Sequence, residues 1–253
     1  MAKQPNLLIL GGTTEAHRLA EAVAARGWDA VLSYAGRTAA PRAQPVPIRI
    51  GGFGGLAGLV AYLRAEQVTH LIDATHPFAA TMSRNAVAAA EVTGVPLAAL
   101  TRPAWHPTPG DDWVDVPSMD AAAEALDRPA TRVFLAIGRQ ELGAFAGQPQ
   151  HDYLLRLVDP PAGPLPLPRS TVVVDRGPFD VAGDTALLQQ HDIQLVVAKN
   201  AGGEGARAKL EAARTLGLPV VMIARPALPE RLTFHDPDAL LDWVAHPATA
   251  LGV

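Results

Sequence analysis

The sequence repeats itself, and this repeat constrains the fold more than any other feature. The segment VTGVPLAALTRPAW matches TLGLPVVMIARPAL, with Gly94 and Arg102 corresponding to Gly217 and Arg225 at an offset of 123 residues. Further pairs of segments follow in the same order, among them IRIGGFGGLAGLVAYLRAE with VVVDRGPFDVAGDTALLQQ. Self-similarity at a nearly constant offset is typical of tandem duplication, so we expect two similar halves.

Within each half, short apolar runs alternate with helix-like segments. Runs such as LIDA and LVVA are apolar almost throughout, as parallel strands are when both faces of a sheet are covered. We therefore predict an α/β fold of two tandem doubly wound, Rossmann-like domains with parallel sheets and a ligand cleft between them. The predicted domains are residues 1–128 and 129–253. The long connection AWHPTPGD leaves open an exchange of the terminal strand and helix between the halves.

Composition excludes several classes of function. The net charge of −4 comes from 21 basic and 25 acidic residues spread along the chain, which argues against a nucleic-acid surface. The absence of cysteine excludes disulfides and thiolate chemistry, and we predict no metal site. There is no apolar run long enough for a membrane span, and MAKQPNLLILGG reaches glycine before a signal-peptide core could form. We expect a cytoplasmic monomer.

The first apolar run ends in a candidate nucleotide-binding turn. Gly11 and Gly12 follow NLLIL and precede a segment with helical periodicity. The fit to G-x-G-x-x-G/A is incomplete because Thr13 stands at the second glycine position. The first amides of the helix and the hydroxyls of Thr13 and Thr14 would face a bound phosphate. The alternative is an ordinary glycine turn with Thr13 as the helix cap.

The second strand indicates which dinucleotide would bind. A domain that prefers NAD usually carries a carboxylate at the end of this strand, where it binds the ribose 2′-hydroxyl. The segment AVLSYAGRT has none, and it offers Ser33, Arg37 and Thr38 as donors, with Arg42 nearby. A hydroxyl and a guanidinium suit a 2′-phosphate, so NADPH is favoured over NADH.

Two further turns would lie at the same edge of the first sheet. The glycine cluster after the third strand, Gly51 to Gly55, would allow a ligand close to the backbone. The turn DATHPFAA places Asp73, Thr75 and His76 where a reacting substrate should lie, with Pro77 in the first turn of a helix. His76 is either a proton-handling group or a structural histidine.

The second half has cations at the corresponding strand ends. Arg139, Arg176, Lys199 and Arg225 follow its strands, and Asn200 stands beside Lys199. Such a concentration of positive charge indicates an anionic substrate carrying several carboxylates.

Together, GGTTEA, AGRT, DATHPFA, GRQEL and KNAGG resemble the precorrin-6A reductase family of cobalamin biosynthesis. The resemblance covers nearly the whole chain. It implies NADPH-dependent reduction of one double bond of precorrin-6A to give precorrin-6B, with an anionic tetrapyrrole as substrate. It leaves open whether that substrate carries cobalt.

The resemblance also implies residue roles. The pyrophosphate would be held by Gly11, Gly12, Thr13 and Thr14, and the 2′-phosphate by Ser33 and Arg37. The nicotinamide side would be formed by Gly51, Gly52, Gly54, Asp73, Thr75 and His76. The substrate would meet His76, Arg139, Arg176, Lys199, Asn200 and Gly202. His76 is the candidate proton donor, with water as the alternative.

Two rival classes are compatible with two α/β lobes. One is a cofactor-free enzyme of the uroporphyrinogen III synthase type, which would bind a similar polyanion and ignore NADPH. The other is a solute-binding protein that closes on its ligand. The glycine turn with Ser33 and Arg37, present only in the first half, argues against the first rival, and the absence of an export signal argues against the second.

Overall fold

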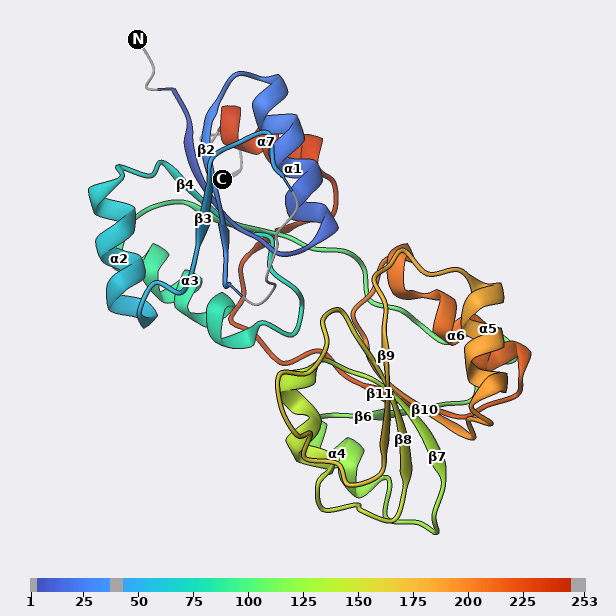
Figure 1. Cartoon of the computed structure of the whole chain (residues 1–253). Helices are drawn as coiled ribbons and strands as arrows, with labels where there is room; N and C mark the ends of the chain where they lie inside the picture. Colours follow the sequence, from blue (N-terminus) through green and yellow to red (C-terminus); the bar gives the residue numbers. More distant parts are fainter. Residues whose placement is uncertain (1–3, 37–42, 247–253) are drawn as a thin grey trace. The chain divides into compact units, whose positions relative to one another are not determined.

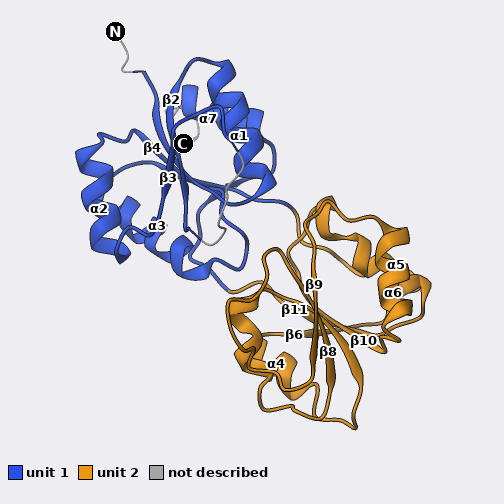
Figure 2. Cartoon of the chain, viewed as in Figure 1, with its two compact units in different colours: residues 1–102, 227–253 blue, residues 103–226 orange. Residues whose placement is uncertain are grey.

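The computed structural model of the chain describes residues 4–36 and 43–246. The chain divides into two compact units (Figures 1 and 2), the first formed by residues 1–102 and 227–253 and the second by residues 103–226. Each unit contains one six-stranded sheet in which every strand pair is parallel. The predicted α/β fold with two parallel sheets is confirmed.

The first sheet has the strand order β12-β5-β4-β1-β2-β3. Its strands are β1 (Asn6–Leu10), β2 (Asp29–Tyr34), β3 (Ile48–Ile50), β4 (His70–Asp73), β5 (Leu97–Leu100) and β12 (Leu232–Phe234). This is the Rossmann order, with β12 in the sixth position. Helices α1 (Thr14–Ala25) and α7 (Pro237–Ala245) pack together, as do α2 (Gly55–Ala65) and α3 (Ala80–Thr93).

Alternation along β1 shows why this sheet needs helices on both faces. Leu7 and Ile9 belong to the core cluster that includes α1 and α7, whereas Leu8 and Leu10 belong to the cluster that includes α2 and α3. All four side chains are almost fully buried. A strand that is apolar at every position is therefore stable only between two layers of helices.

The second sheet has the equivalent order β6-β11-β10-β7-β8-β9. Its strands are β6 (Trp113–Val116), β7 (Arg132–Ala136), β8 (Asp152–Leu157), β9 (Ser170–Val174), β10 (Leu195–Lys199) and β11 (Val220–Ile223). Its helices are α4 (Met119–Glu124), the 3₁₀ helix η1 (Arg139–Phe145), α5 (Val181–Gln190), the 3₁₀ turn η2 (Glu204–Ala206) and α6 (Ala208–Thr215).

The predicted boundary between residues 128 and 129 does not match these units. Strand β6, from the end of the first half, pairs with β11 of the second unit, and β12 from the end of the chain pairs with β5 of the first. The terminal strand and helix of each half are therefore exchanged. The sequence could not decide this because either edge accepts a parallel strand of similar pattern.

Pro77, expected in the first turn of a helix, lies outside one, and the two units also differ after the equivalent strands β1 and β7. The helix α3 begins at Ala80, and Pro77 lies before it in a turn closed by the hydrogen bond from the Ala79 amide to the His76 carbonyl (2.7 Å). The segment after β7 forms only the short η1 instead of a counterpart to α1. Gly143 within RQELGAF disfavours helix continuation there.

In the described residues, no helix is both long and apolar enough to cross a membrane.

His70, at the start of β4, links the sheet to the exchanged helix α7. It is 7% exposed, and its ring makes an edge contact with Trp243 at a centroid distance of 5.4 Å. Among the described residues its buried Nε2 has no hydrogen-bond partner. Burial lowers the pKa of His70 below its usual value of 6.5, because the charged ring would lose its hydration.

The fold should therefore lose stability in mild acid. The folded-state pKa of His70 lies below the unfolded value, so its contribution is complete above about pH 6.5 and is lost as the pH falls toward the folded pKa. We expect the free energy of unfolding, measured with urea, to fall between pH 7.5 and pH 5.5, and His70→Gln to reduce this difference. The exposed His106→Gln should keep the wild-type pH dependence. An unchanged dependence in His70→Gln would contradict the assignment.

Candidate active site

The turn between β1 and α1 is built around two glycines. The Gly11 amide donates to the Ser33 carbonyl (2.9 Å), which joins the turn to the end of β2. A Cβ at Gly11 would lie 2.5 Å from the Leu32 side chain, so a larger residue there would force Leu32 to move. Gly12 has φ +115°, a conformation that other residues rarely adopt. The chain therefore passes closely over the sheet edge, as a phosphate-binding turn requires.

Thr13 is the N-cap of α1. Its Oγ1 accepts from the Ala16 amide (3.1 Å) and donates to the Ala74 carbonyl (2.8 Å) after β4. The hydroxyl proton of Thr13 is thus used within the protein, whereas we had expected it to face the phosphate. The exposed Thr14 and the first amides of α1, at Thr14 and Glu15, have no acceptor within the helix and remain the natural donors to an anion.

Glu15 places a carboxylate in this first helical turn. It forms an ion pair with Arg102, which follows β5, at 3.2 Å, and both side chains are mostly buried. The pair offsets a negative charge that would otherwise repel a phosphate at the helix N-terminus. Arg102 was singled out in the sequence only through its match with Arg225, so this contact was missed.

The end of β2 leads into the segment expected to bind a 2′-phosphate. Ser33 is 5% exposed and next to last in the strand. After it, the Tyr34 hydroxyl accepts a hydrogen bond from the side-chain Nε2 of Gln44 (2.7 Å), and the side-chain Oε1 of Gln44 lies 2.7 Å from Nδ1 of His17 on α1. Arg37 lies outside the described residues, as do Thr38 and Arg42.

The glycine turn after β3 is held by an arginine from the strand itself. Arg49 donates to the carbonyls of Gly51 and Gly52, the latter at 2.9 Å. Its guanidinium lies 3.9 Å from the ring centroid of Phe53. Gly54 caps α2 without a side-chain hydrogen bond and has φ +82°. The turn is thus rigidly placed and leaves the amides at the start of α2 for other partners.

The turn after β4 is organised by Asp73. One carboxylate oxygen accepts from the amide and hydroxyl of Thr75, at 3.1 and 2.7 Å, and the other lies 3.2 Å from Arg231. His76 accepts a hydrogen bond from the Phe78 amide at Nδ1 (3.2 Å). In the neutral ring, the proton of His76 therefore resides on Nε2. Because the strands are parallel, this turn and the Gly11 turn lie at the same edge of the first sheet.

The expected cations of the second unit differ in their surroundings. Lys199, at the end of β10, forms a mostly buried ion pair with Glu141 of η1 at 2.6 Å. Arg139 is exposed, and Arg176 is 57% exposed with Asp159 at 3.8 Å. The sequence showed the positive charges but not the carboxylates that face two of them. Arg139 and Arg176 are the better placed of the three to meet an external anion.

Asn200 and Gly202 hold the segment between Pro103 and β6, through which the chain enters the second unit. We call it the entering segment. The Asn200 side chain accepts from the Trp105 amide (2.8 Å) and donates to the Trp105 carbonyl (2.9 Å). A Cβ at Gly202 would overlap the Pro103 carbonyl. Arg225 donates to the carbonyls of Asn200 and Ala201, at 2.9 and 3.0 Å. These contacts hold the entering segment, and the expected contact of Asn200 and Gly202 with the substrate stays a prediction.

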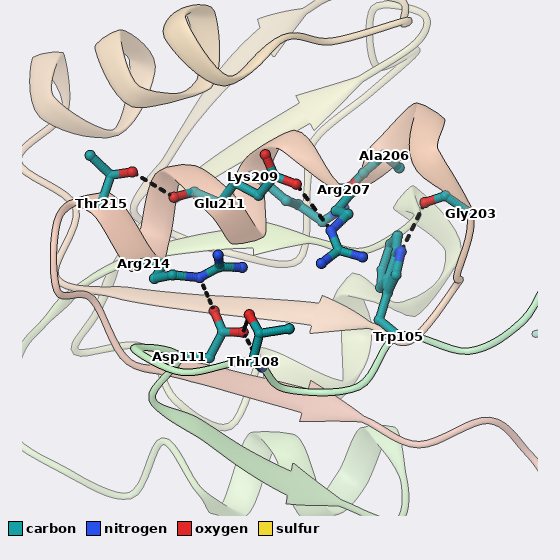
Figure 3. A network of polar contacts seen from close by, with 10 residues as sticks. All are labelled: Trp105, Thr108, Asp111, Gly203, Ala206, Arg207, Lys209, Glu211, Arg214 and Thr215. Atoms are coloured by element: carbon teal, nitrogen blue, oxygen red, sulfur yellow. Dashed lines mark hydrogen bonds and ion pairs between the residues drawn. The ribbon is translucent and has the colours of Figure 1, made fainter.

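The same entering segment is fixed further along (Figure 3). The Trp105 indole donates to the Gly203 carbonyl (2.8 Å), and Asp111 accepts from Arg214 of α6 (2.9 Å) and from the amide and hydroxyl of Thr108. Burial works to raise the pKa of Asp111, but the hydrogen bonds from Arg214 and Thr108 prevail and lower it. The segment is therefore an ordered part of the second unit.

Comparison with known proteins decides the family. The family profile "Precorrin-6x reductase CbiJ/CobK" matches residues 6–245. The chain belongs to this family. It is 60% identical to the precorrin-6A reductase of Rhodobacter capsulatus over 98% of this chain and 99% of the relative. The precorrin-6A reductase of Sinorhizobium sp. is 49% identical, with 96% and 94% covered. The solved structure titled "CobK precorrin-6A reductase" matches with a TM-score of 0.92, 60% identity, and coverage of 98% and 100%.

Membership of the CbiJ/CobK family confirms the resemblance seen in the sequence motifs. The family is neither a uroporphyrinogen III synthase nor a solute-binding protein, so both rival classes lose their support. In this family member, the turns after β1, β2, β3 and β4 all belong to the first unit. The expected substrate residues from Arg139 to Gly202 all belong to the second.

Replacement of Asn200 should loosen the entering segment. In Asn200→Ala, the Trp105 amide and carbonyl lose their partners, and such a loss in a buried setting costs about 1–3 kcal/mol. We expect a lower melting temperature and a red shift of tryptophan emission that is absent in a Trp105→Phe background. The exposed Gln189→Ala is the matched control and should change neither. Wild-type stability in Asn200→Ala would refute the structural assignment.

Proposed function

We propose that the protein reduces precorrin-6A to precorrin-6B with NADPH in cobalamin biosynthesis. Its family membership and its 60% identity to a precorrin-6A reductase over nearly the whole chain are the observations that carry this proposal. Both of the relatives described above are named for precorrin-6A, which favours a substrate without cobalt. The cytoplasmic location and the monomeric state stay predictions.

We assign NADPH to the first unit. The close packing of Gly11 on Leu32 and the positive φ of Gly12 keep the turn close to the end of β1, where a nucleotide phosphate would bind. Thr14 and the first amides of α1 would bind the pyrophosphate, and Thr13 would shape the turn through its bond to Ala74. Ser33 and Arg37 would bind the 2′-phosphate, and the turn of Gly51, Gly52 and Gly54 would approach the nicotinamide side.

The corresponding edge of the second unit is unsuited to a nucleotide. The short η1 takes the place of α1, so the long helix N-terminus that would face a phosphate is missing from the described residues after β7. Arg156 is the next-to-last residue of β8, the position that Ser33 has in β2. It forms a buried ion pair with Asp184 through two nitrogens and two oxygens, and its guanidinium lies 3.5 Å from the ring centroid of Phe179. If a nucleotide bound here as proposed for the first unit, this ion pair would stand at the strand end that faces the ribose. The contrast supports one nucleotide per chain.

The reaction needs a hydride and a proton. Bound NADPH would supply the hydride. Asp73 and Thr75 would fix the β4–α3 turn beside the nicotinamide, and His76 would present its Nε2 proton. His76 is our candidate for proton delivery because its Nδ1 accepts a hydrogen bond from the Phe78 amide, which leaves the ring proton on Nε2.

We assign the tetrapyrrole carboxylates to the second unit. Arg139 and Arg176 would meet them directly, and Lys199 would contribute through its pair with Glu141. Asn200 and Gly202 would act on the substrate only indirectly, by seating the segment around Trp105.

Nucleotide preference tests the cofactor assignment. Fluorescence titration should give tight NADPH binding and weak NADH binding by the wild type. Arg37→Ala should weaken NADPH binding about 10- to 100-fold, as expected for loss of a charge-assisted contact, and leave NADH binding unchanged. Arg64→Ala, at the far end of α2, is the control and should keep the preference. Failure of the wild type to bind either nucleotide would overturn the assignment.

Steady-state kinetics test the substrate assignment. Arg139→Gln should raise KM for precorrin-6A about 3- to 10-fold, the size of one partly exposed charge contact, while the Kd for NADPH stays unchanged. Arg169→Gln is a matched control, since that arginine is also exposed but pairs with Asp152 at the amino end of its strand. An unchanged KM in Arg139→Gln would contradict the assignment.

A further inference from the structure

The β4–α3 turn is held from within by the carboxylate of Asp73. Asp73 is 2% exposed, and its Oδ1 accepts both hydrogen bonds from Thr75. The position of this one carboxylate therefore sets the backbone and side chain of Thr75 and the start of the turn that presents His76. Whatever fixes Asp73 also fixes the turn.

The other oxygen of Asp73 faces a guanidinium from a distant part of the chain. Nη2 of Arg231 lies 3.2 Å from Oδ2, and the Arg231 side chain is only 14% exposed. Arg231 directly precedes β12, the strand that returns to the first unit after the chain has formed the second. The exchanged strand thus reaches the turn through a buried ion pair.

The exchanged strand is itself fixed on both sides of this contact. Before it, Arg84 of α3 donates to the Ala227 carbonyl (3.2 Å). After it, β12 pairs with β5, and the Thr101 amide donates to the Phe234 carbonyl (3.0 Å). Arg231 therefore extends from a rigid support, as a residue that positions another group must.

The geometry of the pair differs from that of a purely stabilising ion pair. In the second unit, Arg156 and Asp184 meet through two nitrogens and two oxygens. In the Asp73–Arg231 pair, Oδ2 of Asp73 and Nη1 of Arg231 are buried and have no hydrogen-bond partner among the described residues. Buried ion pairs are weak evidence for stability, and one so incompletely satisfied is better explained by the geometry that it imposes.

We propose that Arg231 is a positioning residue that holds Asp73, and through it the β4–α3 turn, in the arrangement needed for hydride transfer. The catalytic part rests on the proposed function, because it assumes that this turn lies beside the nicotinamide. The ordering of the turn by Arg231 does not depend on any ligand. The two parts can therefore be tested separately.

The test compares three variants of the full chain. Arg231→Met removes the guanidinium, and Arg231→Lys keeps a positive charge at the same position in case Arg231→Met does not fold. Arg26→Met is the control, since Arg26 also joins the exchanged segment to the first unit, through an exposed pair with Asp238 (3.1 Å). The first readout is amide hydrogen exchange of peptides covering residues 73–79 without ligand. The second is kcat and KM with NADPH and precorrin-6A.

In Arg231→Met, or in Arg231→Lys if Arg231→Met is unfolded, we expect faster exchange in residues 73–79. We also expect kcat to fall about 10- to 100-fold, as small misplacements of catalytic groups do, with KM for precorrin-6A little changed. Arg231→Lys should recover part of kcat, and Arg26→Met should match the wild type. Unchanged exchange in the turn, or unchanged kcat despite faster exchange, would overturn the proposal. If the wild type does not use NADPH, the proposed function fails, and the exchange data still decide whether Arg231 orders the turn.

Discussion

Both sheets depend on an edge strand that comes from a distant part of the sequence. Strand β5 would expose its backbone donors and acceptors if β12 did not pair with it, and β11 requires β6 in the same way. The first unit therefore needs residues from both ends of the chain, and the connections at residues 102–103 and 226–227 follow from that need.

The duplicated scaffold has been specialised by a few substitutions at equivalent positions. In the first unit, the fourth residue of α2 is Gly58, where a Cβ would overlap the Phe53 carbonyl. The fourth residue of α5 is Asp184, which instead forms the buried pair with Arg156. Arg49 of β3 lies over Phe53 in the first unit. In the second unit, Arg156 of β8 lies over the equivalent Phe179. The two units thus pack different side chains at the equivalent helix starts.

Charge is where inference from the sequence was least complete. Lys199 and Arg225 were predicted to face the substrate, because both follow parallel strands. In the structure, Lys199 forms an ion pair with Glu141, and Arg225 donates hydrogen bonds to backbone carbonyls. Sequence shows which residues carry charge at a sheet edge, but the partner of each one is chosen by packing. Glu15 and Arg102, or Asp73 and Arg231, meet only because separate strands bring them together.

The sequence by itself determined the alternation of strands and helices, the duplication, the glycine turn after β1 and the family. The period of the apolar residues encodes the alternation, the conformational freedom of glycine encodes the turn, and the family follows from the resemblance of several short motifs in their order. The tertiary structure decided which half receives each terminal strand, and it gave Asn200 and Gly202 a structural role. It also brought Arg231 to Asp73. Contacts of this kind join residues far apart in the chain, and because many partners would satisfy the same local pattern, only the packed fold selects among them.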